Sequence, residues 1–102
     1  MLNFVSLTDN KTVSLKDANT VYINDTTKNY TVTIPDKNEV NFPIGTTFKI
    51  FCQNKGKISF SMQSDEYGIA GGGTLAVSTK YGSITIEKVS STFWMVTGDV
   101  TP

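Results

Sequence analysis

The acidic side chains that lie closest together in the sequence are Asp65 with Glu66 and Asp36 with Glu39. Paired carboxylates can bind a hard cation such as calcium, or act as acid and base on a glycosidic bond, if their oxygens converge at one point. Their spacing does not require such convergence, and acidic residues in turns are most often solvated charges. We therefore expect neither a metal site nor a catalytic carboxylate pair.

Other residue types that commonly carry chemistry are scarce. The chain has no histidine, which is the most frequent general base and a common transition-metal ligand, and Cys52 is its only cysteine. The triple glycine at 71–73 lacks the following Lys-Ser/Thr and the helix of a phosphate-binding loop. It is more typical of a loop tip, or of close backbone approach at an assembly axis. The sequence predicts no catalytic residue and no cofactor.

Length and charge limit the partners. A chain of 102 residues is the size of one domain. Its nine basic and nine acidic side chains cancel to a formal charge of zero, so it lacks the cationic surface that binds a nucleic-acid backbone. No apolar run approaches the roughly 20 residues that span a bilayer, and no secretory signal is visible at the N-terminus. Neither nucleic acid nor a membrane is an expected partner.

Alternating apolar and polar residues predict strands at 30–34, 47–53, 56–62, 83–89 and 93–97, with weaker signals at 12–13, 21–23 and 75–77. Short turns rich in Asn, Gly and Pro separate them. Residues 14–19 could form at most one helical turn. The prediction is an all-β fold of about seven to nine short strands, arranged as a small antiparallel β-sandwich or barrel-like module.

The C-terminal strand carries large apolar residues on both of its faces. Phe48 and Trp94 fall on the inward faces of their strands, which leaves Phe51, Phe93 and Met95 on the opposite faces. A thin domain has difficulty covering adjacent strands on both faces, so another copy of the chain is the simplest cover. Phe51, Phe93 and Met95 are therefore candidates for an interface between chains.

The order of motifs resembles a small β module of tailed-bacteriophage virion proteins, found as the C-terminal part of tail-fibre or head-associated proteins or as a separate short protein. The resemblance covers about residues 21–99 and rests on YTVTIP (30–35), FPIGT (42–46), GKISF (56–60), the stretch 71–75, YGSITIEK (81–88) and FWMVTGD (93–99). The loop 63–73 is shorter and more acidic than in that module.

This resemblance implies a non-enzymatic structural protein, commonly a homotrimer, made in the host cytoplasm and mounted on the outer surface of the virion. Because only about twenty residues precede the module, we expect a capsid decoration (cement) protein bound to the major capsid protein or another virion protein. Residues 21–102 would form the β module, and residues 1–20 would form an anchor. The apolar residues of that anchor are Leu2, Phe4, Val5 and Leu7. An ordinary first strand explains them equally well.

The alternative function is a tail-fibre or receptor-binding tip that recognises host surface glycans. In that case exposed loop residues would contact the sugar, and the candidates are Asp65, Glu66, Tyr67 and Tyr81. An enzyme acting on glycans is a third class, supported only by scattered carboxylates, and we do not expect it.

Overall fold

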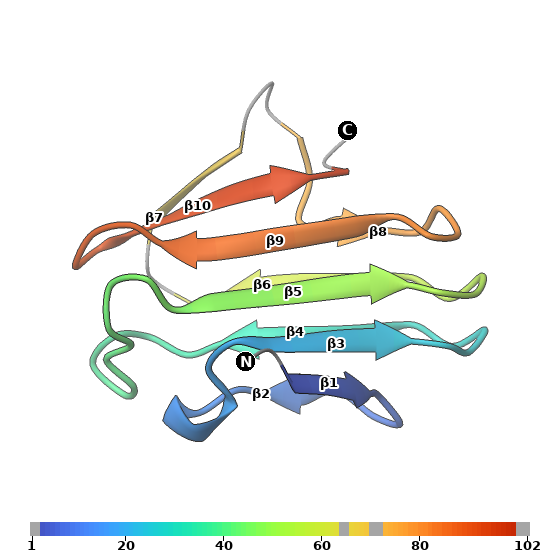
Figure 1. Ribbon diagram of the computed structural model, residues 1–102, viewed down its shortest axis with the longest axis horizontal. Helices are drawn as coiled ribbons and strands as arrows, with labels where there is room; N and C mark the ends of the chain where they lie inside the picture. Colours follow the sequence, from blue (N-terminus) through green and yellow to red (C-terminus); the bar gives the residue numbers. More distant parts are fainter. Residues whose placement is uncertain (1–2, 64–65, 70–72, 100–102) are drawn as a thin grey trace.

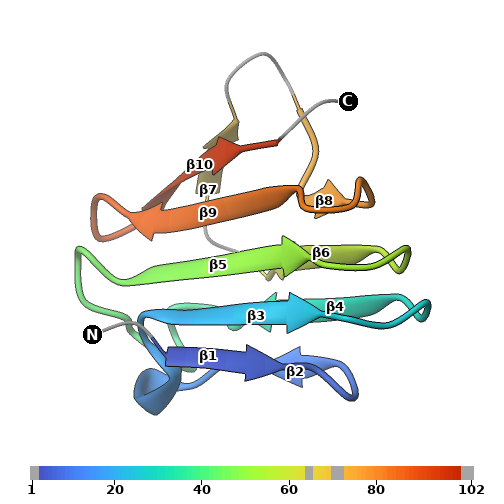
Figure 2. The same ribbon diagram turned by 45° about the vertical axis from the view of Figure 1, so that its right-hand side comes forward.

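The computed structural model describes residues 3–63, 66–69 and 73–99, without the side chain of Glu66. Strands make up 48% of the structure, and no α-helix occurs in the described residues. The strands form two facing layers (Figures 1 and 2). Sheet A consists of β1 (Asn3–Ser6), β3 (Thr20–Asn24), β5 (Thr47–Cys52), β9 (Ser83–Lys88), β10 (Phe93–Gly98) and β7 (Glu66–Ile69), in this spatial order. Sheet B consists of β2 (Lys11–Thr12), β4 (Tyr30–Ile34), β6 (Ile58–Met62) and β8 (Ala76–Val77).

The first six strands wind as a flattened coil that alternates between the two sheets. β1, β3 and β5 stack in parallel in sheet A, and β2, β4 and β6 stack in parallel in sheet B (Figure 1). The second and third turns of the coil match residue for residue, since Tyr22 pairs with Ile50 and Tyr30 pairs with Ile58. Residues 20–34 and 48–62 are therefore structural repeats, which the sequence analysis did not identify.

The all-β, two-layered fold is confirmed, but the predicted antiparallel arrangement is wrong. Among the described strands, five pairings are parallel and three are antiparallel. The reason is that the turns at 25–29 and 53–57 carry the chain from one sheet to the other instead of closing a hairpin. Each time the chain comes back to a sheet, its new strand therefore runs in the same direction as the strand before it in that sheet. Only the last part of the chain reverses, where β9 pairs antiparallel with both β5 and β10.

The core fills the space between the sheets. Alternation along the strands turns every second residue inward. In β4 and β5, buried residues therefore alternate with partly exposed ones. Trp94 is fully buried and packs edge-to-face against Phe42, with ring centroids 5.9 Å apart. The Lys88 side chain is only 1% exposed and places its ammonium 5.8 Å from the centre of the Trp94 ring. The fold buries this charge without an ion pair in the described part of the chain.

The N-terminal residues belong to the same two sheets as the rest of the chain. β1 pairs with β3, and β2 pairs with β4. Leu7 was a candidate anchor residue, but it lies in the core, where its buried side chain cannot contact a partner. Phe4 and Val5 are exposed, whereas Leu2 lies outside the described residues. Whether the exposed pair contacts another protein stays a prediction.

The weak helical signal at 14–19 corresponds to a single 3-10 turn, Leu15–Asp17, which confirms that expectation. In the described residues, no helix is long and apolar enough to cross a membrane.

Candidate functional site

The outer face of sheet A carries apolar residues that the core does not use. Strand alternation directs Phe51 outward from β5, and it directs Phe93 and Met95 outward from β10. All three predicted interface residues therefore lie on one face of one sheet. Phe51 and Phe93 are half-buried, and Met95 is 41% exposed.

A groove of about 310 Å³ occupies one end of this face, over β1, β3 and β5. Parallel register places Phe4 beside Val21, and Val21 beside Lys49. The next row places Ile23 beside Phe51. Phe4 is 68% exposed, so a large aromatic ring borders the groove and faces solvent. We call these five residues the β1–β5 groove.

The sequence pattern indicated Phe51 as an interface candidate and Phe4 as an anchor candidate, but it gave no sign of Ile23 or of a groove. The three strands are far apart in the sequence, and only their parallel register brings Phe4, Ile23 and Phe51 together. The repeat between residues 20–34 and 48–62 is the signal that could have revealed it, since Ile23 and Phe51 occupy equivalent positions.

A second apolar patch, formed by Phe93 and Met95, lies on the same face over β10. It differs from the groove because its own chain covers part of it. Gly68 of β7 lies under Phe93, and a Cβ at Gly68 would be 2.8 Å from the tip of the Phe93 ring. Glycine at this position therefore lets the ring lie flat against the edge strand. Met95 projects beyond it and is the most exposed member of the Phe93–Met95 patch.

Opposite charges accompany the two apolar regions. Lys49 lines the groove, and Glu87 is the register partner of Met95. The only ion pair in the described part of the chain joins Lys11 and Asp17, so Lys49 and Glu87 form none there. Each of the two regions thus carries one charge that a complementary surface could neutralise.

The outer face of sheet B has a different chemistry. The outward positions of β4 and β6 are hydroxyl side chains, with Thr33 and Ser61 in one row and Thr31 and Ser59 in the next. The Thr31 and Ser59 hydroxyl oxygens are 3.4 Å apart. Small hydroxyl residues are suited to permanent contact with water, whereas the outer face of sheet A is suited to contact with protein.

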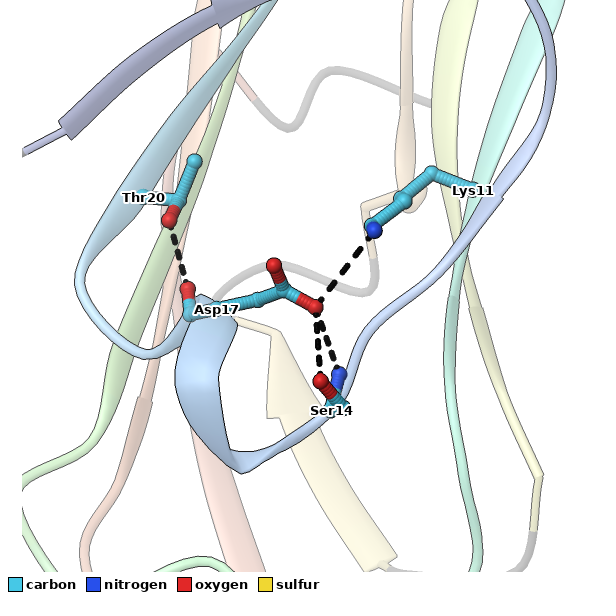
Figure 3. Close-up of polar contacts among 4 residues, drawn as sticks. All are labelled: Lys11, Ser14, Asp17 and Thr20. Atoms are coloured by element: carbon cyan, nitrogen blue, oxygen red, sulfur yellow. Dashed lines mark hydrogen bonds and ion pairs between the residues drawn. The ribbon is translucent and has the colours of Figure 1, made fainter.

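Asp17 is the centre of the polar cluster shown in Figure 3. Its carboxylate accepts hydrogen bonds from the Ser14 amide at 2.8 Å and from the Ser14 hydroxyl at 3.0 Å, and it lies 3.5 Å from the Lys11 ammonium. Burial acts to raise the pKa of Asp17, but the bonds from Ser14 and the charge of Lys11 together bring this pKa below its ordinary value. The Thr20 hydroxyl donates to the Asp17 carbonyl oxygen at 2.6 Å.

This cluster closes the connection between β2 and β3, and its contacts are those of a capping box around the 3-10 turn. Close by, burial raises the pKa of the Tyr22 hydroxyl to about 12, and the Asp17 carboxylate adds to this effect, whereas Thr20 lowers it. The Tyr22 oxygen nevertheless reaches no hydrogen-bond partner in the described part of the chain. Tyr22 is sealed in the core, so its hydroxyl is not presented to solvent.

The acidic pairs considered first do not converge where the structure describes them. Asp36 accepts a hydrogen bond from the Asn38 amide at 2.9 Å and its carbonyl oxygen accepts from Glu39, so both residues belong to one turn. Asp65 and the side chain of Glu66 lie outside the described residues. Across the described ranges, no three His, Cys, Asp or Glu side chains are grouped to hold a metal ion.

The two predicted loop tyrosines are exposed but lie in different settings. Tyr67 is in edge strand β7, as the register partner of Trp94, and is 43% exposed. Tyr81 is in the turn between β8 and β9. It borders a hollow described below.

No protein-family model and no curated protein matches this chain. The assignment of function therefore depends on the surfaces described above and on the motifs of the sequence.

Proposed function

We propose that this chain is a non-enzymatic structural protein of a tailed-bacteriophage virion, which assembles as a homotrimer through the outer face of sheet A. The observation that carries the proposal is the placement of Phe51, Phe93 and Met95 on that single face, together with the neighbouring groove. Exposed apolar groups rimmed by polar residues are typical of surfaces that bind other proteins.

The two apolar regions favour a cyclic assembly. One region is a groove and the other is a projecting patch, and they lie toward opposite ends of a six-stranded sheet. Because sheets twist, opposite ends of one face point in different directions. Contact between the Phe93–Met95 patch of one copy and the β1–β5 groove of the next is heterologous, and such contacts form a ring when the rotation from copy to copy closes. Lys49 in the groove would then approach Glu87 beside the patch.

The virion assignment is supported by the motif resemblance and by the contrast between the two sheets. A decoration protein needs one surface for assembly and another that stays in water. The hydroxyl-rich outer face of sheet B meets the second need. Val5, exposed on β1, remains a candidate for contact with the major capsid protein or another virion protein, whereas Phe4 belongs to the groove. We place the protein on the outer capsid surface as a cement protein.

Self-association can be tested with Met95→Lys. The unaltered protein is expected to have about three times the 11.1 kDa mass of one chain in size-exclusion chromatography with light scattering. Even with Glu87 beside it as register partner, a lysine ammonium would have to lose its water in the contact, so the variant trimer should dissociate at concentrations at least about tenfold higher. Thr33→Lys on the outer face of sheet B is the matched control and should leave the mass unchanged.

Charge reversal tests the same contact without altering its apolar residues. Lys49→Glu and Glu87→Lys should each weaken the trimer, and the double variant should recover it, because the two charges have exchanged places. Lys49 and Glu87 also lie diagonally across the neighbouring strands β5 and β9 of one chain, so the thermal unfolding of each variant should be unchanged if the pair acts between chains. A monomeric unaltered protein at high micromolar concentration, or a double variant no better than either single one, would contradict the proposed interface.

The position on the particle is tested by the number of copies in purified virions. A capsid decoration protein is expected in hundreds of copies, and deletion of its gene should make the capsid fail at a lower temperature. A tail appendage would give only a handful of copies. Full heat resistance in the deletion phage would argue strongly against a cement function.

A further inference from the structure

Tyr81 has a positive φ, a backbone conformation that is energetically unfavourable for a residue with a bulky side chain. Four of the described residues have a positive φ: Asn19, Gly45, Tyr81 and Gly98. Glycine and asparagine adopt this region readily, but a bulky aromatic residue does so only under constraint. Tyr81, with φ of 70°, is therefore the exception among them. Such strain tends to persist where the side chain has a function.

The hydrogen bonds that hold this turn do not require the tyrosine side chain. The Tyr81 amide donates to the Cys52 carbonyl oxygen at 2.6 Å, and the Gly82 amide donates to the Thr79 carbonyl oxygen at 2.8 Å. The Cys52 amide in turn donates to the Gly82 carbonyl oxygen at 2.9 Å. These are backbone bonds that glycine at position 81 would form equally well. Packing does not account for the ring either, since Tyr81 is 66% exposed.

The ring borders a hollow of about 370 Å³ formed by residues 76–82 and Asp99. The polar residues that line it are Ser78, Thr79, Lys80 and Asp99. Asp99 is held in place by the Ser83 amide, which donates to its Oδ2 at 2.8 Å. The Lys80 ammonium lies 5.2 Å from the centre of the Tyr81 ring. The Tyr81 ring therefore lies beside residues that can donate hydrogen bonds and residues that can accept them.

We propose that this hollow binds a neutral carbohydrate, with a sugar ring stacked on Tyr81. A pyranose presents an apolar C–H face and a rim of hydroxyls that both donate and accept hydrogen bonds. The apolar face matches an exposed tyrosine ring. The hydroxyl rim matches a site that combines a carboxylate, an ammonium and hydroxyls. A phosphate or other anion fits less well, because Asp99 would repel it beside Lys80.

The carbohydrate site and the self-association surface are formed by different residues. The turn between β8 and β9 lies at the end of the sandwich where the turns after β3 and β5 also lie (Figures 1 and 2). The outer face of sheet A, by contrast, follows the length of the strands. Sugar binding therefore does not rest on the trimer or on the virion assignment.

The probes are glucose, galactose, N-acetylglucosamine and their short oligomers, added to the full chain and observed by saturation-transfer NMR. At least one of these sugars is expected to show transfer, and Tyr81→Gly should weaken its binding on the order of tenfold. Tyr67→Ala, which removes another exposed tyrosine, is the control and should bind normally. Absence of transfer for the whole series, or full binding by Tyr81→Gly, would overturn the proposal.

Thermal unfolding separates a binding function of Tyr81 from a structural one. If the ring serves binding, Tyr81→Gly should melt at or above the temperature of the unaltered protein, because relief of strain offsets the greater freedom of glycine in the unfolded chain. Tyr81→Asn, which also tolerates a positive φ, provides a second variant. Clear destabilisation by both substitutions would show that the ring supports the fold, and the argument from strain would then fail.

Discussion

Gly56→Ala is expected to lower the free energy of unfolding by at least about 4 kcal/mol, a large part of the stability of a small domain. A Cβ at this position would overlap the carbonyl oxygen of Lys28 and lie 2.7 Å from the carbonyl oxygen of Thr26. Both atoms are backbone, so neither can move without separating two stacked turns. The Gly56 amide also donates to the Thr26 carbonyl oxygen at 3.0 Å, and this bond would be lost as the turns separate.

Urea unfolding followed by far-UV circular dichroism measures this effect. Gly45→Ala is the informative control, because nothing lies within 4 Å of a Cβ there although φ is +97°. It should cost only about 1 kcal/mol, the usual penalty for a side chain in the left-handed region. Similar losses in the two variants would mean that the turns at 25–29 and 53–57 are less tightly stacked than the structure shows.

Asn24→Ala is expected to cost about 2–4 kcal/mol. Asn24 is fully buried at the end of β3, and its amide nitrogen donates to the carbonyl oxygens of Lys28 at 2.8 Å and Lys57 at 3.0 Å. Its Oδ1 accepts from the Thr26 amide and hydroxyl. One side chain therefore joins two successive turns of the coil. Alanine would remove four hydrogen bonds at a part-buried site and leave the Lys57 carbonyl oxygen with only the Tyr30 amide as donor, which costs more than the loss of one exposed hydrogen bond.

Asn29→Ala is the matched control for this prediction. Asn29 is exposed, and its Oδ1 accepts from the Lys57 amide at 3.0 Å in the same region. Water can replace that acceptor, so we expect a loss below about 1 kcal/mol. Chemical denaturation of both variants compares the two sites directly. A loss at Asn29 as large as that at Asn24 would contradict the assignment of Asn24 as the buried link.

The stacked turns explain how a chain of this size supports a parallel coil. Parallel strands need crossover connections, which most proteins build from helices. Here the crossovers at 25–29 and 53–57 pass directly between the two sheets. Their polar backbone groups must still be satisfied, and Asn24 supplies several of the required bonds. At the equivalent position in the next turn, the buried Cys52 thiol lies 3.2 Å from the carbonyl oxygens of Asn54 and Gly56.

The sequence by itself determined where most strands lie and which of their faces turn inward. Alternation placed strands at 30–34 and 83–89, and the structure has β4 at Tyr30–Ile34 and β9 at Ser83–Lys88. It also placed Trp94 inside and Met95 outside. These features are local, since the two-residue period of a strand decides the face of each side chain whatever its partner strand is.

Only the tertiary structure decided the direction of pairing and the surfaces that depend on it. The alternation of a strand is the same in parallel and antiparallel sheets, so the sequence pattern could not show that the turns cross between layers. Parallel stacking then brought Phe4 and Ile23 to the groove beside Phe51, and it buried Leu7 in the core. The positive φ of Tyr81 accompanies long-range backbone bonds that join Tyr81 and Gly82 to Cys52, which no local pattern around position 81 reveals.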